Sequence, residues 1–200
     1  MANHEYTAAD ITVIEFDESV RKRPGMYFRV GLDNPRLPTE ILSTVASHIL
    51  HPTAGVAESH TLSGLIEVLG DLRLRVTLDE PPAWQDTPAL GYYDSLLGFN
   101  WWSLATVAAL CERTSVEMWR DGQGFRQELA GIRPLAAVER FDPYPGSGMR
   151  VTFMLDVGIL LPEAAFPAEF EGIDMHGEYC TQEPGPGYVT IRDHRQAGGL

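Results

Sequence analysis

The stretch VRKRPGMY, residues 20–27, decides the fold, and it begins inside a short predicted helix. The charge and capping pattern of residues 16–23 predicts that helix, with Asp17 or Ser19 as its N-terminal cap. Pro24 and Gly25 then end it, because both residue types interrupt regular helices. The chain therefore opens with a helix and a sharp break.

Outward from this stretch, apolar residues repeat with helical or strand spacing. Helical spacing predicts helices over 38–51 and 103–113, a short helical piece near 90–97 and a partial helix over 162–171. Alternation and turn residues predict strands over 63–68, 72–78 and 148–156, a hairpin turning at Asp121-Gly122, and a closing strand within 184–195. Few helices and many hairpin-joined strands indicate an α+β sandwich, with helices on one face of an antiparallel-rich sheet.

Composition narrows the class of protein. The chain has 200 residues, 44% of them hydrophobic, which suits one domain with its own core and excludes a mainly disordered chain. No apolar run approaches the ~20 residues of a membrane helix, and the first residues lack the pattern of a signal peptide. Cys111 and Cys180 cannot build a disulfide framework, so we expect a cytoplasmic protein. The net charge of −13 disfavours direct contact with nucleic acid, because phosphate contacts need a basic surface.

VRKRPGMY resembles the signature near the start of the ATPase domain of the gyrase B subunit and of its topoisomerase IV relatives. These are GHKL ATPases with a Bergerat-type nucleotide fold. Later elements follow the family's order, with Arg120-Asp121-Gly122 at a hairpin, Gly148 before a strand and VTIRDHRQAGG near the end. The resemblance implies a two-layer Bergerat sandwich with a mixed, mostly antiparallel sheet and helices on one face.

The same resemblance divides the chain into two parts. Residues 1–15 resemble the family's dimerisation arm, and residues 16–200 resemble a single ATPase-type domain without the family's transducer domain. Tyr6 and Ile11 stand at places comparable to the tyrosine and isoleucine of that arm. The arm either pairs two copies into a homodimer or is disordered.

Aligned with the family's ATP-site helix, this sequence lacks the residues that handle water and metal. Ser43 stands at the general-base glutamate, Ala46 at the aspartate, and Ser47 at the asparagine that binds magnesium. Without a carboxylate, no side chain on this helix face can take a proton from water well. A serine is also a poor sole ligand for magnesium, which prefers carboxylates and phosphates.

The segments that hold the base and the phosphates have changed as well. The adenine segment reads LDEPPAW, in which Asp79 can stand in for the family's aspartate, and Met149 replaces a threonine that helps to hold the base. The glycine-rich lid becomes LGFNWWS, residues 97–103, with Trp101 where bare backbone would approach phosphate. The sequence therefore predicts a pseudo-ATPase with no cofactor and no metal.

These replacements predict an aromatic, apolar pocket, which suits a small and largely apolar molecule. The residues predicted to line it are Ser43, Ser47, Phe99, Asn100, Trp101, Trp102 and Met149. His51 shares a helix face with the two serines and is the candidate general acid or base, oriented by Asp79 or Asp94. In the alternative interpretation the serines are packing residues, His51 only favours the helix C-terminus, and the tryptophans fill a collapsed pocket.

Two functions from different classes remain open. In the first, the former nucleotide pocket binds or converts a small apolar metabolite, by a cofactor-independent cyclisation or rearrangement in secondary metabolism. In the second, the chain is a non-catalytic interaction protein that pairs with gyrase B subunits and modulates gyrase or gives resistance to its inhibitors. Neither function requires a membrane or direct contact with nucleic acid.

Overall fold

One sheet forms the centre of the molecule. The computed structural model describes residues 13–80, 84–170, 173 and 189–195. The strands are β1 Gly64–Gly70, β2 Arg73–Leu78, β3 Cys111–Arg120, β4 Gln123–Ala130, β5 Arg133–Pro134, β6 Glu139–Phe141, β7 Gly148–Leu155 and β8 Val189–Asp193. Their order across the sheet is β5-β4-β3-β7-β2-β1-β8, and β6 also pairs with β4. Among these strands only β1 and β8 run parallel, so the predicted mixed, mostly antiparallel sheet is confirmed.

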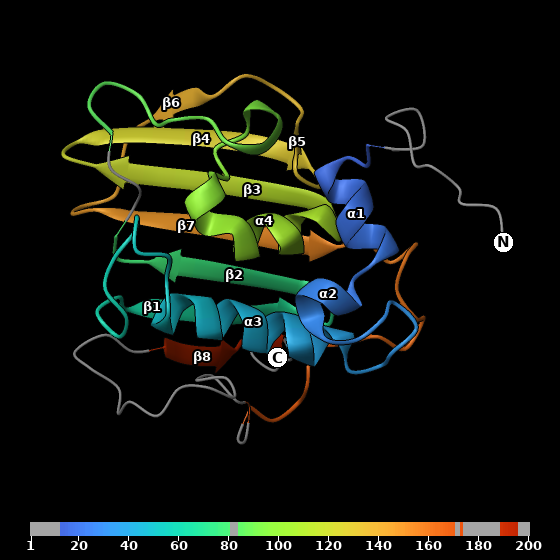
Figure 1. The fold of residues 1–200 in the computed structure, drawn as a ribbon. Helices are drawn as coiled ribbons and strands as arrows, with labels where there is room; N and C mark the ends of the chain where they lie inside the picture. The colour runs from blue at the N-terminus through green and yellow to red at the C-terminus, as the bar shows by residue number, and fades with distance from the viewer. Residues whose placement is uncertain (1–12, 81–83, 171–172, 174–188, 196–200) are drawn as a thin grey trace, which may run out of the picture.

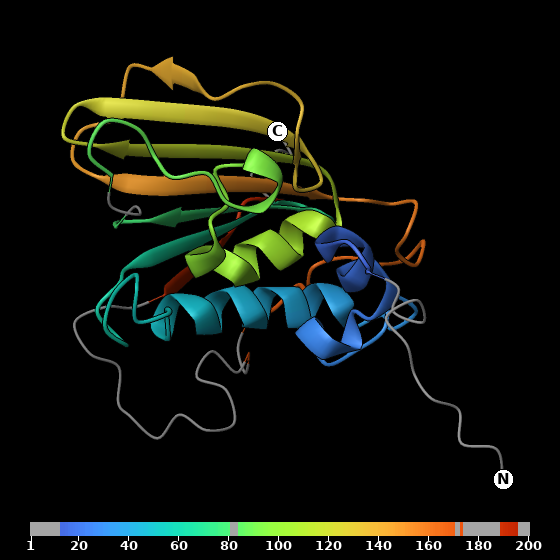
Figure 2. The same cartoon turned by 45° about the horizontal axis from the view of Figure 1, so that its top comes forward.

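The helices lie on one face of this sheet, as predicted (Figures 1 and 2). They are α1 Phe16–Lys22, α2 Gly25–Phe28, α3 Leu37–Leu50 and α4 Trp102–Ala109, with short 3-10 turns η2 Tyr92–Asp94 and η3 Phe99–Trp101. α3 contacts β1, and α4 contacts β3 and β7. The result is a two-layer α+β sandwich that is consistent with a GHKL-type fold.

Alternating side chains explain why the sheet has one buried face. Along β7, Met149, Val151 and Phe153 are buried, as their spacing predicts. The same alternation places Leu74, Val76 and Leu78 of β2 under the helices. On α3, the apolar residues at helical spacing are buried and the helix ends at Leu50, before Pro52. The core therefore lies between the helices and the inner face of the sheet.

Three local predictions are wrong. The N-terminal cap of α1 is Glu15 rather than Asp17 or Ser19, because the helical backbone already begins at Phe16 and places both residues inside the helix. The helix predicted over 103–113 ends at Ala109, and Cys111 already belongs to β3. Its apolar run continues past the helix end because both elements bury side chains in the same core. No helix forms over the described part of 162–171, where two prolines fall and the backbone of Phe166 bonds to Asp71.

Some predictions cannot be compared with the structure. Tyr6, Ile11 and Cys180 lie outside the described residues, and so does most of the predicted arm. Within the described ranges, no helix combines the length and the apolar character that crossing a bilayer requires.

Candidate functional site

The start of α4 packs closely against α3, at the place where the family's phosphate-binding lid is expected. The side chain of Trp101 has no exposed surface, and its ring meets the ring of His48 edge-on at 5.6 Å between centroids. The ring of Trp102, which is 39% exposed, also meets the ring of His48 edge-on, with 5.9 Å between the ring centroids. Met149 on β7 is also fully buried. Two of the predicted pocket-lining residues are therefore part of the packed core.

His48 holds this packing together as a neutral side chain. It is 6% exposed, and burial lowers the pKa of its imidazole to about 4, against a smaller raising effect of a hydrogen bond with the Asn100 backbone. Its Nε2 has no hydrogen-bond partner among the described residues. Sequence reasoning missed this packing role of His48. The signal was its position three residues after Val45 and seven after Ile41, on the apolar face of α3.

The loop that follows α3 also closes onto the start of α4. The hydroxyl of Thr53 donates to the carbonyl of Asn100 at 3.3 Å. A Cβ atom at Gly55 would lie 3.1 Å from the amide nitrogen of the Asn100 side chain, so this loop and η3 are in tight contact. Asn100 is exposed and Phe99 is 67% exposed. These two predicted lining residues therefore lie at the surface above the buried Trp101.

The predicted polar face of α3 is only partly enclosed. Ser43 and Ser47 are half-buried, and the backbone of His51 donates to the carbonyl of Ser47 at the helix end. The ring of His51 lies 4.7 Å from the ring of His60. The structure thus brings His51 to His60, a neighbour that the prediction of a general acid or base did not use.

The two candidate aspartates occupy different places. Asp79 follows β2 and is exposed, and its carboxylate accepts a hydrogen bond from the backbone of Ser63 at 3.0 Å. Asp94 ends η2 and lines a separate cavity over the outer strands of the sheet. Among the described residues, no group of three or more histidine, cysteine, aspartate or glutamate side chains has the arrangement of a metal site.

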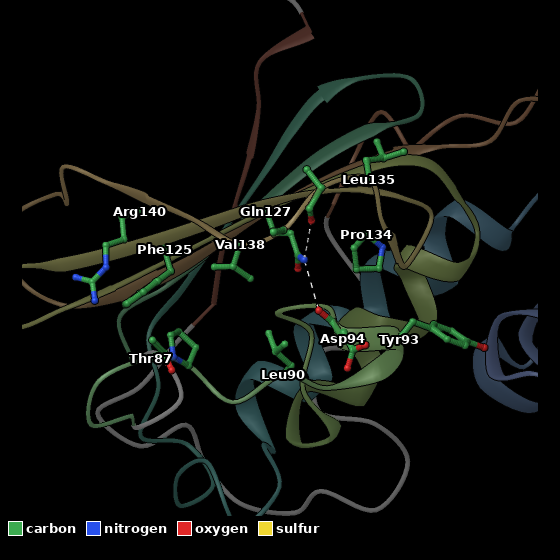
Figure 3. A pocket seen from close by; sticks show the side chains of 13 residues that line it. Thr87, Leu90, Tyr93, Asp94, Phe125, Gln127, Pro134, Leu135, Val138 and Arg140 are labelled. Atoms are coloured by element: carbon green, nitrogen blue, oxygen red, sulfur yellow. Dashed lines mark hydrogen bonds between the residues drawn. The ribbon is translucent and has the colours of Figure 1, made fainter.

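The cavity that Asp94 lines has a volume of about 740 Å³, and Figure 3 shows the side chains around it. Residues 87–94 form one side of it, with the apolar side chain of Leu90 among them. Phe125 and Gln127 of β4 form the floor. Val138 comes just before β6, and Arg140 lies within it. The cavity exists because a loop segment, rather than a helix, covers the inner face of β4.

Gln127 fixes the distance between the two sides. It is buried between Phe125 and Leu129, at a position where the strand alternation calls for an apolar residue. Its amide nitrogen donates to the carbonyls of Ala136 at 3.1 Å and Asp94 at 3.4 Å, and its amide oxygen accepts from the backbone of Leu96 at 2.9 Å. All three bonds run to segments that border the cavity. The glutamine therefore ties both walls to the sheet.

A network of charged and polar side chains lies at the rim of the cavity beside the start of α1. Arg133 donates two hydrogen bonds to the carboxylate of Asp17, at 2.8 and 3.0 Å, and its guanidinium lies 4.0 Å from the centre of the Tyr93 ring. The Tyr93 hydroxyl donates to Asp17 at 2.8 Å and accepts from the backbone of Phe16 at 2.9 Å. The bonds from Arg133 lower the pKa of Asp17. Burial, followed by the bond to Asp17, raises the pKa of Tyr93 to about 12. The network holds Tyr93 in place at the start of α1.

Comparison with known proteins finds similarity to B subunits of DNA topoisomerase 4 and of DNA gyrase. No family model matches the chain. The chain is 30% identical over 171 residues to the B subunit of DNA topoisomerase 4 from Caulobacter vibrioides, a match that covers 76% of this chain and 24% of that protein. It is 28% identical over 173 residues to the novobiocin-resistant B subunit of DNA gyrase from Streptomyces niveus, covering 76% of this chain and 25% of that protein. The chain therefore spans about a quarter of the length of these relatives. This similarity, together with the observed sandwich, suggests a GHKL-type ATPase-like domain.

Proposed function

We propose that this domain keeps the gyrase B-like fold without ATP hydrolysis, and that it binds a small, largely apolar molecule. The observation that carries the first half is the complete burial of Trp101 at the start of α4. Phosphates are bound at such helix starts by bare backbone N–H groups, which need open space in front of them. The burial of the Trp101 indole against the ring of His48 at this helix start supports the proposal that such open space is missing here.

The chemistry of α3 supports the same conclusion. Ser43, Ala46 and Ser47 stand where the resemblance places the base and the metal-binding pair, and none of them carries a carboxylate. Titration of Mg–ATP into the protein should give no heat of binding, and phosphate release should equal that of a blank without protein. A dissociation constant for Mg–ATP in the low micromolar range would defeat this half of the proposal. ATP hydrolysis that co-purifies with the protein would defeat it as well.

The second half concerns where the small molecule binds. The sequence points to the former nucleotide pocket, but the burial of Trp101 and Met149 favours the neighbouring cavity. A volume of about 740 Å³ lies within the range of small-molecule sites, roughly 300–1,000 Å³. Leu90, Phe125 and Val138 give this cavity apolar walls. Whether a reaction follows binding depends on the ligand, and Asp94 is the one predicted catalytic residue at this cavity.

A neutral aromatic probe tests the binding site. 2-Naphthamide should bind saturably with one site per chain in equilibrium dialysis. The probe should also change the fluorescence of Trp84, whose ring lies 5.9 Å from that of Phe125. Leu90→Arg should abolish binding because it places a charge in the apolar wall. Val157→Arg is the matched control, because Val157 is also exposed but lies outside the cavity. Equal binding by both variants would remove the cavity from the proposal.

The alternative is a non-catalytic partner of gyrase B subunits. It is favoured by the similarity to a gyrase B subunit over 76% of this chain. In this case the chain should co-purify with gyrase and inhibit supercoiling, whether or not Leu90 is replaced by arginine. Gyrase that is unaffected by a molar excess of the chain would count against this alternative.

A further inference from the structure

We propose that the ligand of the cavity over β4 carries one acidic group, bound by Arg140, on an apolar body whose other end faces Asp94. This inference rests on the proposed function, because it assumes that the cavity takes a small molecule. It assigns the chemical class of that molecule: an amphipathic monoacid rather than a neutral hydrocarbon or a diacid.

Arg140 is placed to bind an acid. Its guanidinium carbon lies 5.0 Å from the centre of the Phe125 ring, which forms the cavity floor. An aromatic face orients a guanidinium and leaves its N–H edge available for two parallel hydrogen bonds to a carboxylate. In the described part of the chain, Arg140 has no ion pair with an aspartate or glutamate.

The neighbouring arginines behave differently. Arg126 on β4 pairs with Glu139 at 3.2 Å, and Arg133 on β5 pairs with Asp17 at 2.8 Å. Of the arginines between the start of β4 and the end of β6, Arg140 is therefore the one whose charge is not matched by a described protein carboxylate. It is also the one of the three that lines the large cavity.

Asp94 sets the polarity of the opposite end. Figure 3 shows Arg140 and Asp94 on different sides of the cavity, with Phe125 and Val138 on the Arg140 side of Gln127. The backbone carbonyl of Asp94 accepts the bond from Gln127, while no described partner takes its exposed carboxylate. A second acid at this end would be repelled, whereas a hydroxyl or amine could donate to it.

The net charge of −13 does not overturn this assignment. At physiological ionic strength, charges more than about 8 Å apart are largely screened from one another. The side chains that line the cavity therefore decide which end of the ligand binds where, and the acidic remainder of the surface mainly slows the approach of an anion.

Four planar probes of similar size separate the possibilities: neutral 2-naphthamide, monoanionic 2-naphthoate, 6-hydroxy-2-naphthoate, and dianionic 2,6-naphthalenedicarboxylate. We expect 2-naphthoate to bind about tenfold more tightly than the amide, the size of one charge-assisted contact. The hydroxy acid should bind at least as well as 2-naphthoate, and the diacid should bind more weakly than either. Arg140→Met keeps the stem over Phe125 and should remove the advantage of the acid while leaving the amide unchanged.

Two further variants complete the design. Arg126→Met is the matched control, because it removes an arginine of β4 outside the large cavity and should leave all four affinities unchanged. Asp94→Asn should improve binding of the diacid. Equal affinity for the amide and the monoacid, or an unchanged preference in Arg140→Met, would overturn this inference while the proposed function stands. Failure of all four probes to bind would defeat the proposed function, and this inference with it.

Discussion

Two regions of the same sheet face differ in how the space above the strands is filled. Where α3 and α4 cover the sheet, the fully buried indole of Trp101 packs edge-on against the buried ring of His48. Where a loop segment that includes residues 87–94 covers β4, a buried glutamine holds the walls by hydrogen bonds, and a cavity of about 740 Å³ remains. One sheet face therefore carries a closely packed region under α4 and, over the strand next to β3, a cavity with room for a ligand.

The substitution with the largest expected effect on stability is Trp101→Ala, which tests the packed region. Removing a fully buried tryptophan leaves a cavity between α3 and α4, so the free energy of unfolding should fall by about 3–5 kcal/mol. Trp102→Ala, one residue further and 39% exposed, should cost about 1 kcal/mol. Urea unfolding measures both. Similar losses for the two variants would mean that Trp101 does not fill the junction more than its neighbour does.

Acid provides the second test, because the unfolded chain protonates His48 at a higher pH than the folded protein does. Its pKa is lowered from about 6.5 in the unfolded chain to about 4 in the folded protein. The unfolded chain therefore binds the proton first, and the free energy of unfolding falls by up to about 1.4 kcal/mol for each pH unit between 6.5 and 4. Above pH 6.5 this residue adds no slope.

His48→Phe is the matched variant, since it keeps a ring against Trp101 and removes the titrating group. The stability difference between the wild type and this variant should grow in favour of the variant as pH falls through that window. Parallel stability curves from pH 7 to pH 4 would show that His48 is not buried as a neutral side chain.

The sequence predicted much of the packed region and little of the cavity. Alternation over 72–78 and 148–156 and helical spacing over 38–51 have a local cause, so β2, β7 and α3 were predicted close to their observed bounds. The mixed sheet followed from the family resemblance of VRKRPGMY. The sequence also singled out Trp101 at the position aligned with the family's lid, but it could not distinguish a lined pocket from a filled one.

The cavity depends on contacts between residues far apart in the chain, and no local pattern contains those contacts. Gln127 is one polar residue in a strand, and its partners Asp94 and Ala136 lie 33 and 9 residues away. Arg140 gave no signal, because a lone arginine near a turn is usually solvated. Asp94 was predicted as a site residue, but for a site beside His51 rather than for this cavity.

On the cavity side, Gln127→Leu tests whether hydrogen bonds hold the walls apart. Leucine fits the strand but leaves the backbone groups of Leu96 and Ala136 without their partner, so unfolding should become easier by about 2 kcal/mol. Binding of 2-naphthamide should also weaken several-fold. Glu128→Leu, on the exposed neighbouring residue, should change neither property. If the leucine variant is as stable as the wild type and binds the probe equally well, the glutamine does not shape the cavity.

The smallest expected effect is at the rim, where Asp17 joins α1 to Arg133 and Tyr93. Asp17→Asn keeps the shape but weakens a two-bond ion pair at the surface, so we expect a loss of about 1 kcal/mol at pH 7. The folded pKa of Asp17 is lowered below its usual 3.8, so its stabilisation is fully present above pH 3.8 and is lost as pH falls through the folded pKa. The gap between wild type and variant should therefore close only in strong acid.

Tyr93→Phe removes the tyrosine hydroxyl that donates to the Asp17 carboxylate, and it should lower the free energy of unfolding by a similar amount. The double variant should lose less than the sum of the two single losses, because the three side chains share one network. Strictly additive losses would mean that Asp17 binds Arg133 and Tyr93 independently, and that this rim is less rigid than the glutamine-held wall across the cavity.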